Sequence, residues 1–249
     1  MVITLAKIYD RGFKVDMTAL EGVRIAFEEE RKEVLLYLEG KVRELMGDVP
    51  LNLSSPEQLS TLIYSRKPMN KSTWINKIDP YMGQTAFKQL IREETDVVFK
   101  SHVKRCADCY GSGKLRKEKK DGTPYSKQSK CNSCGGNGYH VIPTSTIGGL
   151  KFNAPNAKWA TANGFSTNRK NLELLANSAR SKGLTDSLEF LGKVQRLSAL
   201  DTYLSSFVGG IANNVKSDGM LHVRLNQHMT STGRLSGKEP NMQNMPRGG

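Results

Sequence analysis

The sequence predicts a mainly helical α+β protein with antiparallel long helices, a small zinc-ribbon insertion and an incomplete strand layer near the C-terminal end. Stripes of apolar residues at helical spacing run through 18–46 and 185–211, and each stripe needs a partner helix to cover it. Two copies of the pattern C-x-x-C-x-G-x-G lie between these stripes. Apolar and polar residues then alternate over 221–225, as in a half-buried strand.

The first long helix is expected over 18–46. Thr18 and Glu21 have the spacing of a capping box, in which the hydroxyl accepts from first-turn amides and the carboxylate reaches back. Gly47 is a residue type that commonly follows a helix C-terminus. A helix of this length spans about 40 Å, so it must lie against another long helix. Its apolar stripe consists of Leu20, Val23, Phe27, Val34, Leu38, Val42 and Leu45.

A shorter helix is expected to begin at Ser55 and Pro56. The serine is suited to capping, and proline in the first turn sacrifices no helical hydrogen bond. The apolar side of this helix consists of Leu59, Leu62 and Ile63.

Further elements follow in order along the chain. We expect a short helix over 85–99, a helix beginning at Thr167, and a long helix over 185–211 that pairs with the first one. The residues at 216–219 predict a turn before the strand at 221–225. The apolar positions of the two later helices are Leu172, Leu174, Leu175, Leu188, Leu191, Leu197, Leu200, Leu204, Val208 and Ile211.

The cysteines form two tight pairs within the segments 106–113 and 131–138. Two cysteines separated by two residues can turn both thiolates toward one ion, and the glycines that follow permit the tight turn. Four thiolates complete a closed tetrahedral site, which predicts a structural zinc ion. An iron–sulfur cluster is the alternative, although nothing in the sequence indicates redox chemistry. The predicted ligands are Cys106, Cys109, Cys131 and Cys134.

The doubled cysteine pattern resembles the cysteine-rich domain of DnaJ-type chaperones. The resemblance covers only 106–138, with one pair of repeats and no J-domain motif. It implies a similar zinc fold and does not imply a chaperone function.

Positive charge is concentrated around the cysteines. Lysine and arginine number 37 against 24 acidic residues, for a formal net charge of +13. Cations placed against phosphates release condensed counterions, so this excess favours a nucleic-acid partner. The alternative is a solvated basic loop. The cations that we expect to contact phosphate are Lys114, Arg116, Lys117, Lys119 and Lys120.

The most specific stretch reads N-Q-H-M-T-S-T-G-R-L-S over 226–236 and P-N-M-Q-N-M-P over 240–246. It strongly resembles the signature of family A (DNA polymerase I-like) DNA polymerases, roughly N-Q-x-x-T-x-T-G-R-L-S-S-x-x-P-N-L-Q-N-I-P. Gly237 stands where serine is usual, and Met242 and Met245 replace leucine and isoleucine. Upstream, R-G-F-K-V-D and L-N-L-S-S-P-E-Q-L are similar to the entry into the family's thumb and to a later thumb step.

The resemblance implies a thumb whose first half is 1–65, an insertion over 66–165, a second thumb half over 166–213, and the start of the palm over 214–249. It implies that Arg234 reaches the minor groove near the primer terminus. Amide and hydroxyl groups in the same motif suit contacts to phosphate, sugar and minor-groove acceptors. The implied DNA-binding residues beside Arg234 are Thr230, Thr232, Asn241, Gln243 and Asn244.

The resemblance also implies a DNA-directed DNA polymerase, a nucleotidyltransferase acting on primer–template DNA. The family's catalytic carboxylates lie on a D-Y-S-x-x-E-L-R strand and an H-D-E turn, and neither motif occurs in the 249 residues. We therefore name no catalytic residue here. Magnesium is expected for the complete polymerase but not on this chain, which we expect to be inactive alone.

Two kinds of partner are then expected: a second polypeptide or missing C-terminal part that carries the remaining palm and the fingers, and a processivity factor that the insertion recruits, as thumb-tip insertions do in some phage members of the family. The alternative function is a stand-alone zinc-containing nucleic-acid-binding protein without polymerase activity. A split subunit, a truncated gene and a partial sequence all fit the residues.

The N-terminal residues M-V-I-T-L-A-K-I-Y-D-R-G carry acid and base early and lack the long apolar core of a signal peptide. No run approaches the ~18 apolar residues of a membrane span. The sequence therefore predicts a cytoplasmic protein without a membrane partner, located in the host cytoplasm if a phage encodes it.

Overall fold

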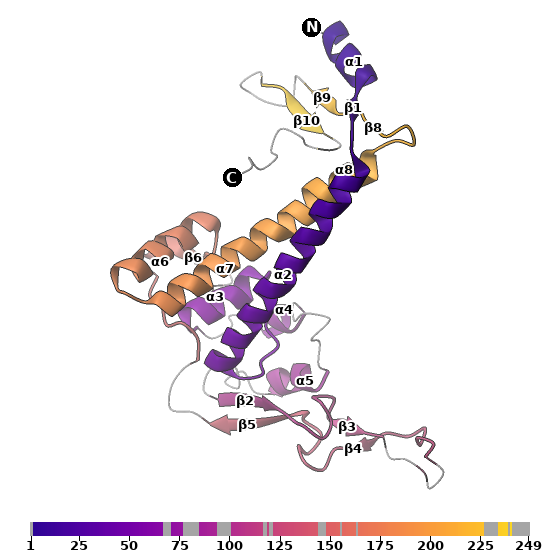
Figure 1. The fold of residues 1–249 in the computed structure, drawn as a ribbon. Coiled ribbons are helices and arrows are strands. Elements are labelled where there is room, and N and C mark those ends of the chain that lie inside the picture. Colours follow the sequence, from indigo (N-terminus) through magenta and orange to yellow (C-terminus); the bar gives the residue numbers. More distant parts are fainter. Residues whose placement is uncertain are drawn as a thin grey trace. The chain divides into compact units, whose positions relative to one another are not determined.

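A computed structural model describes residues 2–66, 71–76, 85–93, 101–116, 119, 122–143, 148–154, 156–162, 164–226, 234–238 and 240. Within these residues the chain is mainly helical, and its named strands form two-stranded antiparallel sheets (Figure 1). This confirms the α+β class. The chain divides into two compact units, 1–36 with 195–249, and 37–194.

Helix α2 (Met17–Met46) confirms the first long helix, but its cap differs from the prediction. The carboxylate of Asp16 accepts hydrogen bonds from the backbone amides of Thr18 and Ala19, both at 3.0 Å. Glu21 is engaged with Arg24 instead of reaching back to a cap amide. The predicted capping box of Thr18 and Glu21 is therefore wrong, because an aspartate two residues earlier already satisfies the first amides.

The apolar stripe of α2 is buried most completely in its C-terminal half. Val34, Leu38 and Val42 are buried, and so is Met46, which the sequence reading omitted. Val23 is 44% exposed, so its place in the predicted buried stripe is wrong.

The partner of α2 is a helical run composed of α7 (Thr185–Thr202), the π-helical segment η3 (Tyr203–Val208) and α8 (Gly209–Asn214). In the first unit, Glu30 accepts from Arg196 at 2.6 and 2.7 Å, and Arg31 donates to Asp201 at 2.6 Å. In the second unit, Lys41 lies 3.6 Å from Asp186. Residues 30 and 31 of α2 thus pair with residues 196 and 201 of α7, whereas residue 41 of α2 pairs with residue 186. The two helices therefore run in opposite directions, which confirms the predicted antiparallel pairing (Figure 1).

Apolar burial contributes more to this pairing than the ion pairs do. The paired charges are one-third to two-fifths exposed in the first unit, and such pairs are typically worth about 0–1 kcal/mol each. Burying a leucine side chain is worth about 1.5–3 kcal/mol. On α7, the leucines that are fully or nearly fully buried are Leu191, Leu197 and Leu200.

Helix α3 (Pro56–Tyr64) confirms the second predicted helix and is buried along its length. The hydroxyl of Ser55, the N-cap residue, makes no capping hydrogen bond, which contradicts the capping role assigned from sequence. A later segment covers the helix: the amide of Leu150 donates to the carbonyl of Leu62 at 2.9 Å. The amide of Phe165 donates to Ser60 Oγ, also at 2.9 Å.

Helix α6 (Arg169–Ser181) begins at the N-cap Asn168, whose side chain accepts from the amide of Asn171. Leu172 and Leu175 are buried as predicted, whereas Leu174 is 48% exposed. Before it come η2 (Ala157–Trp159) and the paired strands β6 (Ala160–Thr161) and β7 (Gly164–Phe165).

Two short helices precede the cysteine region. They are α4 (Lys71–Asn76) and α5 (Thr85–Glu93). Helix α5 confirms the start of the helix predicted over 85–99, and residues 94–100 lie outside the described part of the chain.

The ends of the first unit form two small sheets. Helix α1 (Val2–Arg11), which the sequence reading did not predict, leads into β1 (Phe13–Lys14), which pairs with β8 (Met220–Leu221). Strand β9 (Arg224–Asn226) pairs with β10 (Ser236–Lys238). The predicted strand over 221–225 is therefore split in two at His222, whose ring nitrogen Nδ1 hydrogen-bonds the carbonyl of Tyr9 at 2.5 Å. Leu221 and Val223 are buried as predicted.

Among the described helices, none combines the length and the apolar character needed to cross a membrane.

Replacing Asp16 by alanine should lower the free energy of unfolding by about 0.5–2 kcal/mol, since two first-turn amides lose their acceptor. Chemical denaturation followed by circular dichroism measures the change. Thr18→Ala is the matched control and should cost nothing, because the Thr18 hydroxyl does not cap the helix. A larger loss for Thr18→Ala than for Asp16→Ala would restore the capping box and contradict this assignment.

Candidate metal centre and nucleic-acid interface

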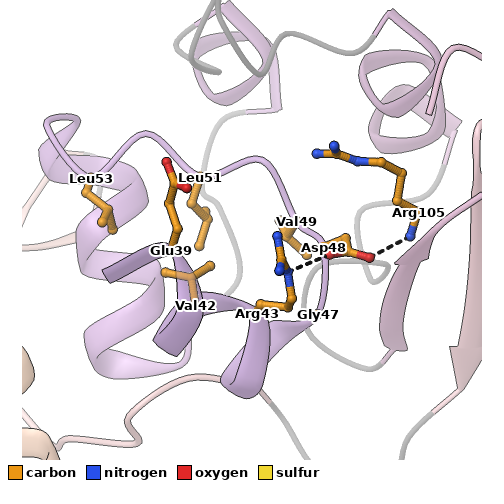
Figure 2. Close-up of a pocket in the computed structure, with 9 residues that line it drawn as sticks. All are labelled: Glu39, Val42, Arg43, Gly47, Asp48, Val49, Leu51, Leu53 and Arg105. Atoms are coloured by element: carbon orange, nitrogen blue, oxygen red, sulfur yellow. Dashed lines mark hydrogen bonds and ion pairs between the residues drawn. The ribbon is translucent and has the colours of Figure 1, made fainter. Parts of the chain in front are cut away.

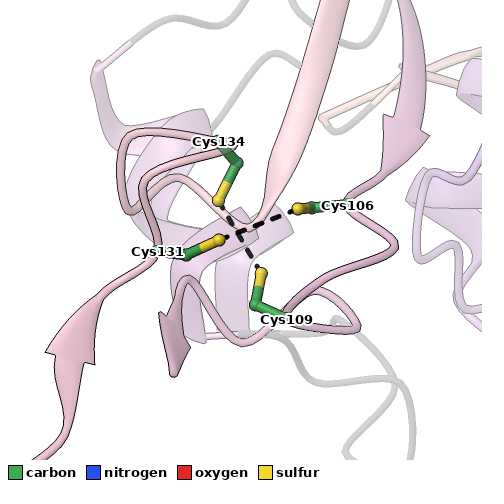
Figure 3. A group of neighbouring side chains, drawn as sticks. All are labelled: Cys106, Cys109, Cys131 and Cys134. Carbon is green, nitrogen blue, oxygen red and sulfur yellow. Dashed lines mark hydrogen bonds between the residues drawn. The ribbon is translucent and has the colours of Figure 1, made fainter. Parts of the chain in front are cut away.

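The four cysteines converge on one point (Figure 3). The Sγ atoms of Cys106 and Cys131 lie 3.9 Å apart, and those of Cys109 and Cys134 lie 3.7 Å apart. All four sulfurs lie within 4.8 Å of one another, and all four residues are buried. Sulfurs bound to one zinc at about 2.3 Å in tetrahedral geometry would be about 3.8 Å apart. The cluster therefore has the dimensions of a four-thiolate metal site.

Two antiparallel hairpins carry the cysteines. Strand β2 (Ser101–Arg105) enters the first cysteine pair, and strand β5 (Tyr139–Pro143) leaves the second pair and runs beside β2. Between the pairs, β3 (Lys114–Leu115) runs beside β4 (Ser129–Lys130). Each pair therefore lies where one hairpin passes into the other.

The two cysteine turns brace each other through a reciprocal exchange of hydrogen bonds. The amide of Cys106 donates to the carbonyl of Gly138, and the amide of Cys131 donates to the carbonyl of Gly113, both at 3.0 Å. The amides of the same glycines donate to sulfur, Gly113 to Cys109 at 3.3 Å and Gly138 to Cys134 at 3.1 Å. Both glycines have positive φ, 71° and 77°, which a side chain would strain. This exchange gives the repeated sequence a local two-fold arrangement.

The surroundings of the sulfurs differ in their effect on ionisation. Burial raises the pKa of Cys109. Burial also opposes ionisation of Cys106, but hydrogen bonds from the backbone amides of Cys109 and Asp108 and from His140 outweigh it and lower the pKa of that thiol. Metals bind thiolates, so amides directed at sulfur favour the ligating form.

A metal ion held by this donor set would have no open coordination position. Four cysteines can hold a metal ion, and with all four positions taken no site remains for a substrate or an activated water. His140 acts on Cys106 through a hydrogen bond, in keeping with a supporting role.

Strand β2, which leads into the cysteine segment 106–138 (the ribbon), is fixed to the C-terminal end of α2. Gly47 has φ 78°, and a Cβ at this position would lie 2.2 Å from the carbonyl oxygen of Val103, so only glycine allows the approach. Asp48 accepts from the amide of Arg105 at 2.8 Å and pairs with Arg43 at 2.9 Å. The sequence predicted Gly47 as a helix stop, but no sequence signal indicated that Asp48 would join the helix to β2.

A small pocket lies beside this junction (Figure 2). Its volume is about 30 Å³, room for a water molecule or two, whereas ligand pockets usually enclose ~300–1,000 Å³. Much of its lining is apolar, from Val42, Val49, Leu51 and Leu53. It is therefore part of the junction and not a substrate site.

The structure describes some of the residues that the sequence predicted to contact phosphate. Lys114, Arg116 and Lys119 are exposed on and beyond β3, whereas Lys117 and Lys120 lie outside the described residues. Arg234 is exposed two residues before the start of β10. The other predicted contacts of the C-terminal motif, Thr230, Thr232, Asn241, Gln243 and Asn244, also lie outside the described residues.

Residues 146–248 match the family described as DNA polymerase family A. This segment is similar to family A DNA polymerases. It contains the motif around Arg234 and excludes all four cysteines. The cysteine segment 106–138 therefore lies outside the part that matches the family.

Curated proteins that are similar to this chain include bacterial DNA polymerases I. The chain is 49% identical over 45 residues to DNA polymerase I of Mycobacterium leprae, covering 18% of this chain and 5% of that protein. It is 39% identical over 88 residues to DNA polymerase I of a Lactococcus lactis strain, covering 34% of this chain and 9% of the relative. The chain thus matches less than a tenth of these relatives' length.

A solved structure described as the POL domain of Pol1 from M. smegmatis in complex with DNA primer-template and dNTP is also similar. The alignment covers 98% of this chain and 26% of the other, with 19% sequence identity and a TM-score of 0.49.

Replacing Cys131 by serine should remove stoichiometric metal from the purified chain, because a hydroxyl is a poor substitute for a thiolate ligand. Metal analysis by mass spectrometry, together with titration of reactive thiols, measures the loss. Ser133→Ala, an exposed change between Cys131 and Cys134, is the matched control and should retain the metal. Equal metal contents in the two variants would exclude Cys131 as a ligand.

Proposed function

We propose that this chain is part of a DNA-directed DNA polymerase of family A that binds primer–template DNA during template-dependent synthesis. The observation that carries the proposal is the match of 146–248 to the family, a range that contains the polar motif around Arg234. The relatives named DNA polymerase I support the same activity for the complete protein.

The proposed division follows the sequence. Residues 1–65 and 166–213 form the two halves of the thumb, 66–165 form the insertion with its ribbon at 106–138, and 214–249 begin the palm. The paired helices α2 and α7 would then be the thumb's long helices. Such a thumb holds duplex DNA by its backbone, so its contacts are independent of base sequence.

Nucleotide transfer requires magnesium ions held by carboxylates, which stabilise the attacking and leaving oxygens. We propose that this function belongs to parts of the polymerase other than these 249 residues, which contain neither of the family's two carboxylate motifs. The residues of this chain would position the primer end. A further polypeptide or segment carrying the remaining palm and fingers, and a processivity factor, are the proposed protein partners, and the cytoplasm is the proposed location.

We assign the four-cysteine cluster to a structural zinc ion. Tetrahedral four-sulfur sites suit zinc, and zinc brings no redox chemistry that the proposed function would have to explain. One zinc per chain is the expected stoichiometry.

The ribbon is the proposed second contact with DNA. Lys114, Arg116 and Lys119 are exposed around β3. Because the zinc and the strands fix the ribbon's backbone, their cations would meet phosphates with less entropy loss than those of a free loop.

Replacing residues 106–138 by the two-residue turn Asn-Gly should remove the ribbon but keep the helices. Arg105 and Tyr139 are partners in the β2–β5 ladder, so a short turn can join them. DNA affinity should fall, and the slope of log K against log salt should become shallower by about 0.9 for each lost duplex phosphate contact. Fluorescence anisotropy over a salt series measures both.

The matched control keeps the ribbon and removes charge alone, by changing Lys114, Arg116 and Lys119 to glutamine. It should retain zinc and reproduce much of the loss of slope. An unchanged slope in both variants would mean that the ribbon's cations face solvent only.

Arg234→Ala should weaken binding to a primer terminus more than binding to blunt duplex. A hydrogen bond from a charged donor is typically worth about 1.5–3 kcal/mol. The comparison uses matched and mismatched primer ends at fixed salt. Arg169→Ala, which removes an equal charge from an exposed position of α6, is the control and should affect all substrates slightly and equally. Equal losses on every substrate for Arg234→Ala would remove its proposed special role.

A further inference from the structure

One residue of the first cysteine turn departs from the two-fold arrangement of the ribbon. Tyr110 has φ 50°, in the left-handed region that bulky side chains rarely adopt. Its counterpart in the second turn is Gly135, with φ 60°. The following glycines match as well, Gly111 at 85° and Gly136 at 87°. The backbone geometry thus calls for glycine, and the second turn has it.

The side chain of Tyr110 is not buried by the fold. It is 80% exposed, the largest exposed fraction among the large hydrophobic residues that the structure describes. Backbone strain of this kind is concentrated at functional sites, where the side chain's position serves a ligand. A tyrosine held outward on a metal-braced turn is therefore a candidate contact residue.

A second exposed aromatic residue lies in the same ribbon, among cations. Tyr125 is 49% exposed, and the ammonium of Lys119 lies 5.8 Å from the centre of its ring. Lys119 is held in the adjoining turn, where its amide donates to the carbonyl of Thr123 at 2.8 Å. At this place an ammonium group that can attract phosphate lies beside an exposed ring on which a base can stack.

The positive charge continues along the hairpin between the two tyrosines. Lys114 and Lys130 are direct partners across β3 and β4, and both are exposed. The stem of Lys130 lies against the second cysteine turn, where a Cβ on Gly136 would meet its Cε at 2.4 Å. Arg116 and Lys127 are exposed on the two sides of the hairpin beyond the paired strands. Tyr110 and Tyr125 thus occur at the two ends of a cationic hairpin.

Exposed rings beside cations select a particular form of nucleic acid. In a duplex, each base already stacks on its neighbours, so a protein ring finds no free face to cover. In a single strand the bases can splay and stack on aromatic side chains while the backbone follows the cations. Between 106 and 138 the described large hydrophobic residues that are exposed are these two tyrosines, and the exposed cations of the hairpin accompany them.

We propose that the β3–β4 hairpin and the first cysteine turn form a binding site for single-stranded DNA, with Tyr110 and Tyr125 as stacking platforms. The inference rests on the proposed function insofar as the ribbon contacts DNA, and it specifies the strand. Beside a polymerase, the single strand within reach is the unpaired template or a displaced strand. Every base has a π-face, so the site is indifferent to sequence.

The test is Tyr110→Gly in the full chain with its metal bound. The change copies Gly135, so metal content and melting temperature should be maintained or increased. Affinity for an oligothymidylate should fall about 5- to 150-fold, the range that corresponds to one lost base stack. The salt dependence should not change, because no phosphate contact is lost. Tyr110→Phe keeps the ring and should bind like the parent, and Tyr125→Ala should add a second loss.

The outcomes separate this inference from the proposed function. Unchanged oligothymidylate binding by Tyr110→Gly would overturn the stacking site and point to a protein ligand, while the effect of Arg234→Ala on a primer terminus would stand. An equal loss on blunt duplex would overturn the preference for single strands. A loss by Tyr110→Phe equal to that of Tyr110→Gly would assign the effect to the hydroxyl and also overturn stacking.

Discussion

A helix of 30 residues cannot bury an apolar side by itself, and the pairing of α2 with α7 meets this requirement. Because the two helices are antiparallel and far apart in the sequence, everything between Gly47 and Leu184 is an excursion that leaves the end of one helix and returns to the start of the other. This part of the chain contains helix α3, the residues 150–165 that cover it, and the ribbon at 106–138. The pairing thus decides where an insertion can be carried without disturbing the long helices.

The stability of the ribbon cannot come mainly from apolar burial. Its buried core consists of the four cysteines with Leu115 packed against them, which is too little apolar surface to stabilise a small fold in water. A metal ion would supply the missing cohesion, and the hydrogen bonds exchanged by Cys106, Gly113, Cys131 and Gly138 would fix the geometry around it. Stability in the long helices is thus spread over many side chains, whereas in the ribbon it is concentrated at one point.

The sequence predicted those features whose cause is local and periodic. Apolar spacing located α2, α3, α6 and α7, and the repeated cysteine pattern brought the right four sulfurs together. The predictions were wrong where a neighbouring residue could form the same kind of interaction or interrupt the predicted element. Asp16 took the capping role given to Thr18 and Glu21, and His222 interrupted a strand whose alternation was correct. Asp48 and Tyr110 could not be singled out, since their roles depend on β2 and on the comparison of two folded turns. The DNA contacts named from the family motif lie mostly outside the described residues, and of these only Arg234 is placed.

The π-helical segment η3 has a consequence for the direction in which the buried side chains of this helical run point. In it the amide of Gly209 donates to the carbonyl of Leu204, five residues back, so the turn holds one residue more than an α-helical turn would. Such an extra residue rotates everything after it by about 100° around the helix axis. That rotation changes which side of one continuous helical run is buried between Leu200, which is fully buried, and Ile211, which packs against Leu221 and Val223.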